Sequence, residues 1–379
     1  MIRNAHSRVG LLLLGLLIAS NSQGSDRYVL LRQPGPGALD ATRAAHEVAA
    51  VGGKITRVLR YHDGVVAELT PQALSSLQSR LGQGVRIEKD SMARVPEGEL
   101  PAVDSVSAQG VEQPPQTIPW GVVTVRGPDA HAITRGDGVL VCVVDTGIQP
   151  DHPDLADNIA GGENFVSDDT QAWGDDCGHG THVAGIIAAL DNGIGVVGVA
   201  PEAKLFSAKA LDAGGYGTNS SIAEGIRSCV AHHAQVINLS LVVTEDSPLI
   251  HDAIVDARRK GAVIVAAAGN SGGQVFYPAK YPEVIAISGV DMDLKLAPFS
   301  SWGSEIAFTA PGAQIYSTML YGRYAFESGT SMAAPHVSGV EALSIAARRN
   351  HVGARDLGLS SSKQGAGLID ALISVTKTE

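Results

Sequence analysis

Short apolar runs alternate with amphipathic stretches along the chain from Trp120 onwards. The runs are continuously apolar, which is typical of strands buried on both faces of a parallel sheet. The stretches between them repeat apolar residues at helical spacing. We therefore expect an α/β domain with a parallel central sheet and helices on both faces. The expected strands lie at 138–147, 203–211, 234–241, 262–270, 284–290 and 306–312, and the expected helices at 178–190, 221–233 and 247–261.

A different pattern precedes this domain. A strand and turn are expected at 27–35, an Ala-rich helix at 38–53, a hairpin around Asp63-Gly64 at 54–69, a helix at 70–82 and a last strand at 85–95. Thr70 and Pro71 have the N-cap and first-turn chemistry of a helix start. The order strand-helix-strand-strand-helix-strand predicts a small α+β, ferredoxin-like unit. A unit of this size buries little surface and is marginally stable alone.

The first 24 residues have the pattern of a signal peptide. Arg3 and Arg8 precede an apolar run, Val9–Ala19, that is too short to cross a bilayer, and small residues follow near Ser22 and Gly24. The alternative is an uncleaved interfacial anchor. No later segment is apolar enough to span a membrane, so we expect a protein secreted to the extracellular space or periplasm, with no membrane contact after signal removal.

The distribution of charge along the chain supports a division into a basic N-terminal part and an acidic main domain. The first 97 residues carry a net charge of +4 and the remainder −15, within a total of −11. This split suits docking of the first segment on the second, although acidity can also serve solubility alone. The acidic main domain argues against nucleic acid as a partner. We divide the chain into a signal peptide (1–24), a small domain (25–96), a Pro- and Ser-containing linker (97–115) and a main domain (116–379).

Three cysteines are too few for a disulfide scaffold, and their odd number leaves at least one thiol unpaired within the chain. Cys142 falls in a core strand and Cys229 on a helix, and we expect packing roles for both. Cys177 precedes His179 by two residues. It is either a thiol whose modification disturbs that histidine or a buried, inert thiol.

Four residues carry candidate chemistry. Asp145 ends the run "VLVCVVD", His179 begins the helix "GHGTHVAG", Asn270 follows "VIVAAAG", and Ser331 lies in "SGTSMAAPH". Each residue alone could be a cap or turn residue. Together they supply what a serine nucleophile needs, namely a base and a carboxylate that orients the base. The small neighbours of Ser331 leave room for a substrate.

These motifs, with "INLS", "YPAKYPEVIAISGV" and "TAPG", resemble the subtilisin-like serine peptidases from about Gln116 to Asp370, in that family's order of Asp, His and Ser. The resemblance implies that Ser331 is the nucleophile, that His179 is the general base and that Asp145 orients the His179 ring. It also implies that the Asn270 side chain and the Ser331 N–H bind the oxyanion. His182 and His336 are read as structural.

The resemblance also implies where peptide substrates bind. A substrate would lie as an added strand between the edge at 214–218 and the edge at 240–243. Val242 and Val243 depart from the glycines usual in the family. The residues implied in substrate binding are Gly215, Tyr216, Gly217, Ser240, Leu241, Val242, Ala267, Gly269 and Phe276.

Two of these residues bear on specificity. Phe276 and Val242 stand where the family often has glycines around the primary specificity pocket. Both add volume, so we expect small or medium apolar residues to be preferred over Phe and Tyr before the scissile bond. The alternative is that the shortened loop before "YPAKYP" swings Phe276 out of the pocket.

The loop at 190–198 reads as a Gly-rich surface turn or, by the same resemblance, as part of a calcium site. All-oxygen coordination suits Ca²⁺. The implied ligands are Gln116, Asp154, Leu190, Asn192, Ile194 and Val196.

The sequence thus predicts a monomeric serine endopeptidase made as a self-processing precursor, with the 25–96 domain as its propeptide and the maturation cut within 97–115. The competing hypothesis is a catalytically silent, subtilase-fold binding protein. An esterase of the α/β-hydrolase type is excluded by the order of the three residues.

Overall fold

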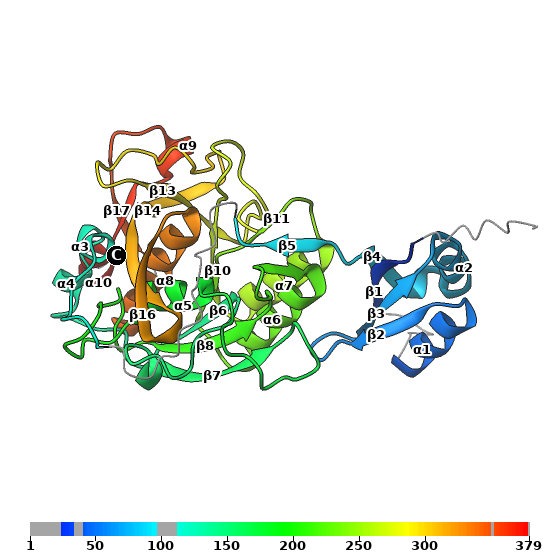
Figure 1. The fold of residues 1–379 in the computed structure, drawn as a ribbon. Helices are drawn as coiled ribbons and strands as arrows, with labels where there is room; N and C mark the ends of the chain where they lie inside the picture. The colour runs from blue at the N-terminus through cyan, green and yellow to red at the C-terminus, as the bar shows by residue number, and fades with distance from the viewer. Residues whose placement is uncertain (1–23, 34–40, 97–111, 350–351, 378–379) are drawn as a thin grey trace, which may run out of the picture.

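The computed structural model describes residues 24–33, 41–96, 112–349 and 352–377. The expected signal peptide lies almost entirely outside the described residues, as does most of the linker. Within them, a small domain at the N-terminal end lies beside a larger α/β domain, and one extended segment of the small domain reaches into the large one (Figure 1).

The small domain has the expected order and an antiparallel four-stranded sheet in the order β2-β3-β1-β4. Thr70 caps the second helix by accepting a hydrogen bond from the Ala73 N–H at 3.2 Å, which explains where that helix begins. The elements are β1 (Asp26–Arg32), α1 (Ala41–Ala50), β2 (Lys54–Val58), β3 (Gly64–Leu69), α2 (Pro71–Leu81), η1 (Gly82–Gly84) and β4 (Val85–Lys89).

The single strand expected at 85–95 is wrong. The chain leaves the small sheet after β4, and β5 (Met92–Arg94) pairs with strands of the large domain. Asp90 causes the break, because its carboxylate accepts hydrogen bonds from the Ser220 N–H at 2.8 Å and the Ser220 hydroxyl at 2.9 Å. Asp90 therefore belongs to the interface between the domains.

The large domain is built on a sheet ordered β17-β18-β14-β13-β12-β10-β6-β8-β7. Its strands pair in parallel except for the β17–β18 pair at one edge. The α/β expectation is confirmed with this one antiparallel addition. The strands are β6 (Leu140–Asp145), β7 (Ile159–Asn164), β8 (Lys204–Lys209), β10 (Val236–Leu239), β12 (Val263–Ala267), β13 (Ile285–Val290), β14 (Ile306–Pro311), β17 (Gly353–Arg355) and β18 (Leu368–Asp370).

Shorter elements complete the large domain. A separate hairpin joins β15 and β16, and β9 and β11 flank β5 in a small sheet. The remaining elements are α3 (Trp120–Thr124), α4 (Gly127–Ala130), η2 (Ala156–Asn158), α5 (His179–Ala188), β9 (Tyr216–Thr218), α6 (Asn219–Ala231), β11 (Val242–Val243), α7 (Pro248–Arg259), β15 (Ile315–Met319), η3 (Leu320–Gly322), β16 (Arg323–Glu327), α8 (Thr330–Ala346), α9 (Ser361–Gln364) and α10 (Ala371–Thr376).

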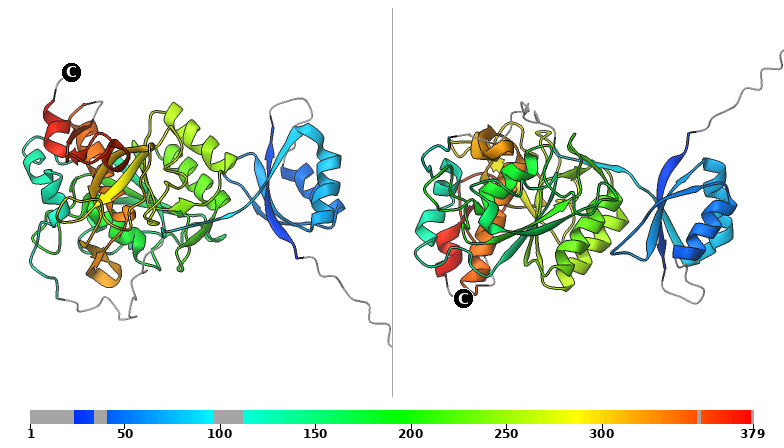
Figure 2. Two further views of the ribbon diagram at one scale, coloured as in Figure 1. Left: turned by 90° about the horizontal axis from the view of Figure 1, so that it is seen from above. Right: turned by 60° about the horizontal axis from the view of Figure 1, so that its bottom comes forward.

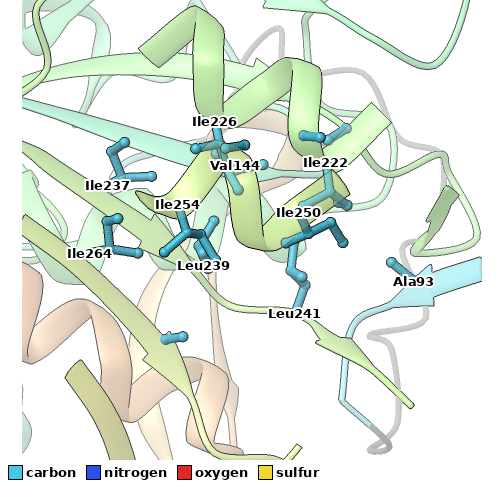
Figure 3. Close-up of a cluster of buried hydrophobic side chains, with 14 of the residues drawn as sticks. Ala93, Val144, Ile222, Ile226, Ile237, Leu239, Leu241, Ile250, Ile254 and Ile264 are labelled. Atoms are coloured by element: carbon cyan, nitrogen blue, oxygen red, sulfur yellow. The ribbon is translucent and has the colours of Figure 1, made fainter. Parts of the chain in front are cut away.

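Both faces of the main sheet are covered. Val141 and Val143 of β6 belong to one core with α5 and α8, whereas Cys142 and Val144 belong to the opposite core with α6 and α7. This alternation follows from the two-residue period of a strand. The two layers are visible in Figures 1 and 2. Figure 3 shows the second core, in which Ile222, Ile226, Ile250 and Ile254 of the helices lie over Ile237, Leu239 and Ile264 of the strands.

The small domain docks against the α6 and α7 side of the large domain (Figure 2). The Glu224 carboxylate of α6 accepts hydrogen bonds from the Arg60 and Tyr61 N–H groups and pairs with His62 Nδ1 at 2.7 Å. Arg57 donates to the Phe165 carbonyl at 2.5 Å. The basic small domain thus meets acidic and carbonyl groups of its acidic neighbour, as its charge favours.

Cys142 and Cys229 form a disulfide that joins β6 to α6, with their Cα atoms 5.6 Å apart. Both side chains are buried in the core, as packing roles require, and the bond between them is an addition that the sequence did not predict. Cys142 points to the face of the sheet that α6 covers, so the two side chains meet inside the second core. Cys177 is the remaining thiol and is buried.

Two predictions follow from the disulfide, one on the number of reactive thiols and one on the free energy of unfolding. One thiol should react with N-ethylmaleimide in the unfolded, unreduced chain and three after reduction. The double variant Cys142→Ala/Cys229→Ala should lose about 4–5 kcal/mol in free energy of unfolding, because the bond closes a loop with a sequence separation of 87 residues. Cys177→Ala, which keeps the bond, is the control for both measurements. Three reactive thiols before reduction would contradict the assignment.

Candidate active site

Four elements bring the predicted catalytic residues to one edge of the main sheet. Asp145 ends β6, Asn270 follows β12, His179 begins α5 and Ser331 lies in the first turn of α8. The carboxyl ends of parallel strands share one edge, and α5 packs beside α8 over the same face. Fragments separated by nearly two hundred residues therefore meet in one site.

His179 and Asp145 form a buried pair. His179 Nδ1 lies 2.7 Å from Asp145 Oδ1, which also accepts the Thr146 N–H at 2.7 Å. A carboxylate at Nδ1 favours the proton on that nitrogen and leaves Nε2 available as a base. Gly180 permits this approach, because a Cβ there would lie 2.1 Å from the Gly147 carbonyl oxygen.

Burial alone would lower the pKa of His179, but the carboxylates around it reverse that effect. The charge and hydrogen bond of Asp145, followed by the charges of Glu327 and Asp175, raise the pKa of His179 to about 9. Burial in turn raises the pKa of Glu327 to about 7. The site therefore favours the imidazolium form of His179.

Ser331 is 2 % exposed and makes two hydrogen bonds with Ser240. The Ser240 hydroxyl donates to the Ser331 carbonyl oxygen at 2.8 Å, and the Ser331 hydroxyl lies 3.4 Å from the Ser240 carbonyl oxygen. The first contact fixes the start of α8 against the strand edge. The second holds the hydroxyl by a long hydrogen bond, and among the described residues no hydrogen bond joins this hydroxyl to His179.

The Asn270 side chain is held so that its amide nitrogen faces the turn before Ser331. Asn270 Oδ1 accepts hydrogen bonds from the Thr330 N–H and the Thr330 hydroxyl, both at 2.9 Å. A Cβ placed on Gly329 would lie 3.0 Å from Asn270 Nδ2 and 3.6 Å from the Ser331 nitrogen. The Asn270 amide nitrogen and the Ser331 nitrogen therefore both lie close to Gly329, the small residue two positions before the nucleophile.

The two predicted binding edges lie on either side of β5. Ala93 pairs with Gly217 of β9, and Arg94 pairs with both Tyr216 and Val242 of β11, all antiparallel. The Val95 N–H donates to the Gly215 carbonyl at 3.0 Å. The small domain's own strand occupies the position predicted for a substrate.

The predicted specificity residues cluster beside this cleft. The Phe276 ring packs on Gly269, where a Cβ would meet the ring at 2.5 Å, and the Phe276 N–H donates to the Ala268 carbonyl at 3.0 Å. Val242 is buried, as are Ala267 and Leu241. The ring is therefore directed toward the β12 end and not away from it.

The six predicted calcium ligands converge on the loop after α5. Asp154 is buried, and its Oδ2 accepts the Val196 N–H at 2.9 Å, whereas Oδ1 lacks a hydrogen-bond partner among the described residues. Burial raises the pKa of Asp154 to about 7. Asn192 Oδ1 accepts the Ile194 N–H at 3.1 Å, Gln116 Oε1 accepts the Gly193 N–H, and the Leu190 N–H donates to the Asp154 carbonyl at 3.0 Å.

The other motif histidines are buried in the core. His182 Nε2 bonds the Ile315 carbonyl at 3.1 Å and His336 Nδ1 bonds the Met332 carbonyl at 2.8 Å. Burial lowers the pKa of His182 to about 3 and of His336 to about 4. Burial also raises the pKa of the Cys177 thiol to about 12, which favours the inert alternative for that residue.

Three residues of the site were not singled out from the sequence. Asp175 accepts from the Thr181 N–H and hydroxyl and so holds the turn into α5. Thr330 fixes Asn270, and Glu327 places a third carboxylate near His179. Of these three residues only Asp175 had a signal in the sequence. It belongs to the Asp-Asp pair before "CGHG", and aspartates are typical of side-chain capping at a helix start.

A serine, an imidazole bonded to a buried carboxylate, and paired N–H donors at one sheet edge are typical of serine hydrolases. The subtilase family model matches residues 136–373. Subtilisin E of Bacillus subtilis (strain 168) is 36% identical over 331 residues, covering 86% of this chain and 81% of that protein. Subtilisin Savinase of Lederbergia lenta is 44% identical over 269 residues, covering 68% and 98%.

A thermostable alkaline protease of Halalkalibacterium halodurans is 47% identical over 230 residues, covering 60% of this chain and 63% of that protein. The chain belongs to the subtilase family and is a serine endopeptidase, a hydrolase of peptide bonds. No helix among the described residues is long and apolar enough to cross a membrane.

Proposed function

We propose that this chain is a secreted endopeptidase that uses Asp145, His179 and Ser331 as its catalytic triad and is made as a self-processing precursor. The observation that carries the proposal is the buried 2.7 Å bond between His179 and Asp145 at the sheet edge that also holds Ser331 and Asn270. This combination serves no packing purpose that apolar residues would not serve better.

In the proposed reaction, His179 Nε2 removes the Ser331 proton as Oγ attacks the substrate carbonyl. Asp145 keeps the ring oriented and stabilises the imidazolium that forms. The Asn270 amide and the Ser331 N–H receive the oxyanion. His179 then protonates the leaving amine, and a water molecule, activated in the same way, hydrolyses the acyl-enzyme.

The small domain, residues 25–96, acts in this proposal as a propeptide that occupies the cleft. β5 pairs on both sides with the edges assigned to substrate, and Asp90 and Glu224 anchor the domain on α6. The maturation cut is assigned to residues 97–115. The partners are therefore peptide or protein substrates and the protein's own propeptide, with the enzyme acting as a monomer.

Secretion is supported by two features. Residues 1–24 have signal-peptide character. The Cys142–Cys229 disulfide in the core suits an oxidising compartment, such as the extracellular space or periplasm.

A calcium ion is proposed at Gln116, Asp154, Leu190, Asn192, Ile194 and Val196. The unpartnered, buried Asp154 oxygen fits a hard cation, and the side-chain and carbonyl oxygens nearby suit its preference for oxygen ligands. When bound, the ion would supply local stability to the loop after α5. The protein's own residues hold the loop by the Asp154–Val196 and Asn192–Ile194 bonds.

Ser331→Ala should abolish peptide hydrolysis and leave the precursor uncut, because both reactions are assigned to the same nucleophile. A fluorophosphonate should label wild-type protein at Ser331 and fail to label the variant, which separates an active enzyme from the catalytically silent alternative. Ser328→Ala, in the same segment, is the control and should retain labelling. Normal processing of Ser331→Ala in a protease-free preparation would refute self-cleavage.

Activity should fall as the pH is lowered through the pKa of His179. The base must be neutral, and its raised pKa places the acid limb of kcat/KM above pH 6.5. Glu327→Gln should move this limb to lower pH by removing a charge that raises the pKa, whereas Asp293→Asn at an exposed position should not. A wild-type limb at or below pH 6.5 would contradict the electrostatic account.

Removal of calcium with EGTA should lower the melting temperature and speed autolysis while leaving initial rates nearly unchanged. At a hundredfold excess over the dissociation constant the ion should add about 2.7 kcal/mol to the free energy of unfolding. Asp154→Asn should reduce this gain, and Asp157→Asn, an exposed neighbour, should keep it. A melting temperature indifferent to calcium in the wild type would exclude the site.

Peptides with Ala, Val or Leu before the scissile bond should be cut faster than those with Phe or Tyr. The Phe276 ring on Gly269 and the buried Val242 reduce the pocket, and overpacking costs about 1–3 kcal/mol, or roughly ten- to a hundredfold in kcat/KM. Phe276→Gly should raise activity on aromatic peptides. A library in which Phe and Tyr rank first would show that the pocket is open.

A further inference from the structure

The register of β5 identifies which residue of the small domain lies nearest to the nucleophile. The Val95 N–H donates to the Gly215 carbonyl, so the main-chain groups of Val95 face β9. In an antiparallel strand alternate residues face opposite neighbours. The main chains of Arg94 and Pro96 therefore face the other edge, where Arg94 pairs with Val242.

Extending this pairing by two residues on each strand places Pro96 opposite Ser240. The pairs Ala93–Val243 and Arg94–Val242 set the register. Ser240 is also the residue that exchanges contacts with Ser331, at 2.8 and 3.4 Å. This extension runs past the ends of β5 and β11, and it assigns to Pro96 the position of the substrate residue that contributes the scissile carbonyl.

Proline is chemically unusual at this position because it has no N–H. A residue with an N–H, placed opposite Ser240, would donate to the Ser240 carbonyl and continue the ladder that Arg94 begins. In the structure that carbonyl lies 3.4 Å from the Ser331 hydroxyl instead. Pro96 is buried, and the Ser331 hydroxyl takes the place of the missing main-chain donor at the Ser240 carbonyl.

We propose that Pro96 makes the end of the small domain a cleavage-resistant occupant of the active site. The inference rests on the proposed propeptide function and deepens it. The bond after Pro96 is cut slowly because the strand cannot complete its hydrogen bonds beside Ser331. Maturation then falls on a bond within the 97–115 linker, and the small domain remains in the cleft as an inhibitor with an intact end.

The strength of this inhibition does not depend on Pro96. Asp90 caps α6 through Ser220, and Glu224 accepts two backbone N–H groups of the β2–β3 connection and pairs with His62. These contacts hold the strand in register from outside the cleft. Replacement of Pro96 should therefore change where and how fast the strand is cut, and not whether the domain binds.

The test follows processing of the full-length precursor by intact mass and N-terminal sequencing. Pro96→Ala should produce a large fragment beginning at Glu97, with cleavage there about tenfold faster than in the wild type, as expected for one restored hydrogen bond. Pro96→Leu provides a second variant with an N–H at this position. Pro71→Ala, at an exposed position at the start of α2, is the matched control and should leave the wild-type cleavage pattern unchanged.

Two results would overturn the inference. One is wild-type cleavage after Pro96 at the rate of Pro96→Ala, and the other is no new fragment at Glu97 in either Pro96 variant while the enzyme hydrolyses added peptide. Failure of the underlying function has a different signature, because Ser331→Ala/Pro96→Ala would then yield the same fragments as Pro96→Ala.

Discussion

The hydrogen bond between His179 and Asp145 is the constraint on which the site depends. Both side chains are buried, so each would incur a large desolvation cost without the other. The bond requires α5 to approach the end of β6 within the reach of one imidazole, and Gly180 is small enough to permit that approach. Once α5 is placed, α8 packs beside it and brings Ser331 to the same edge.

Helix α6 has a comparable role for the small domain. Its first turn receives Asp90, and Glu224, near its middle, receives the β2–β3 connection, so one helix fixes two points of the docking domain. A carboxylate at a helix N-terminus also stabilises the helix itself. Docking and ordering of α6 are therefore coupled, and the position of β5 in the cleft follows from contacts made outside it.

Features that depend on the local pattern of residues could be predicted from the sequence. Continuous apolar strands predicted the main sheet, and Thr70 with Pro71 predicted the start of α2. The motifs around Asp145 and His179 located both side chains at element ends before any geometry was known. The family resemblance was needed to assign roles, because a capping Asp and a helix-start His have the same local pattern whether or not they catalyse.

Features that depend on tertiary contacts could not be read from the chain. Residues 85–95 were predicted as one strand although four polar residues, 88–91, interrupt their apolar positions, and the contact of Asp90 with Ser220 shows that one strand ends there before another begins. The disulfide joins residues with no shared motif, and the pairing depends on which face of β6 meets α6. Glu327 reads as an ordinary strand-end residue until the β15–β16 hairpin places it near His179.

The disulfide also divides the catalytic residues topologically. The loop that it closes runs from Cys142 to Cys229 and contains both Asp145 and His179, whereas Ser331 lies outside. In an unfolded but oxidised chain, the acid and the base lie on one covalent ring, and the serine lies on the chain that leaves this ring at Cys229. The bond also shortens the covalent path between Asp145 and Ser331, because Cys142 lies beside Asp145 in the sequence and Cys229 lies closer to Ser331 than Asp145 does. The entropy lost when the serine is brought to the acid is therefore smaller in the oxidised chain than in the reduced one.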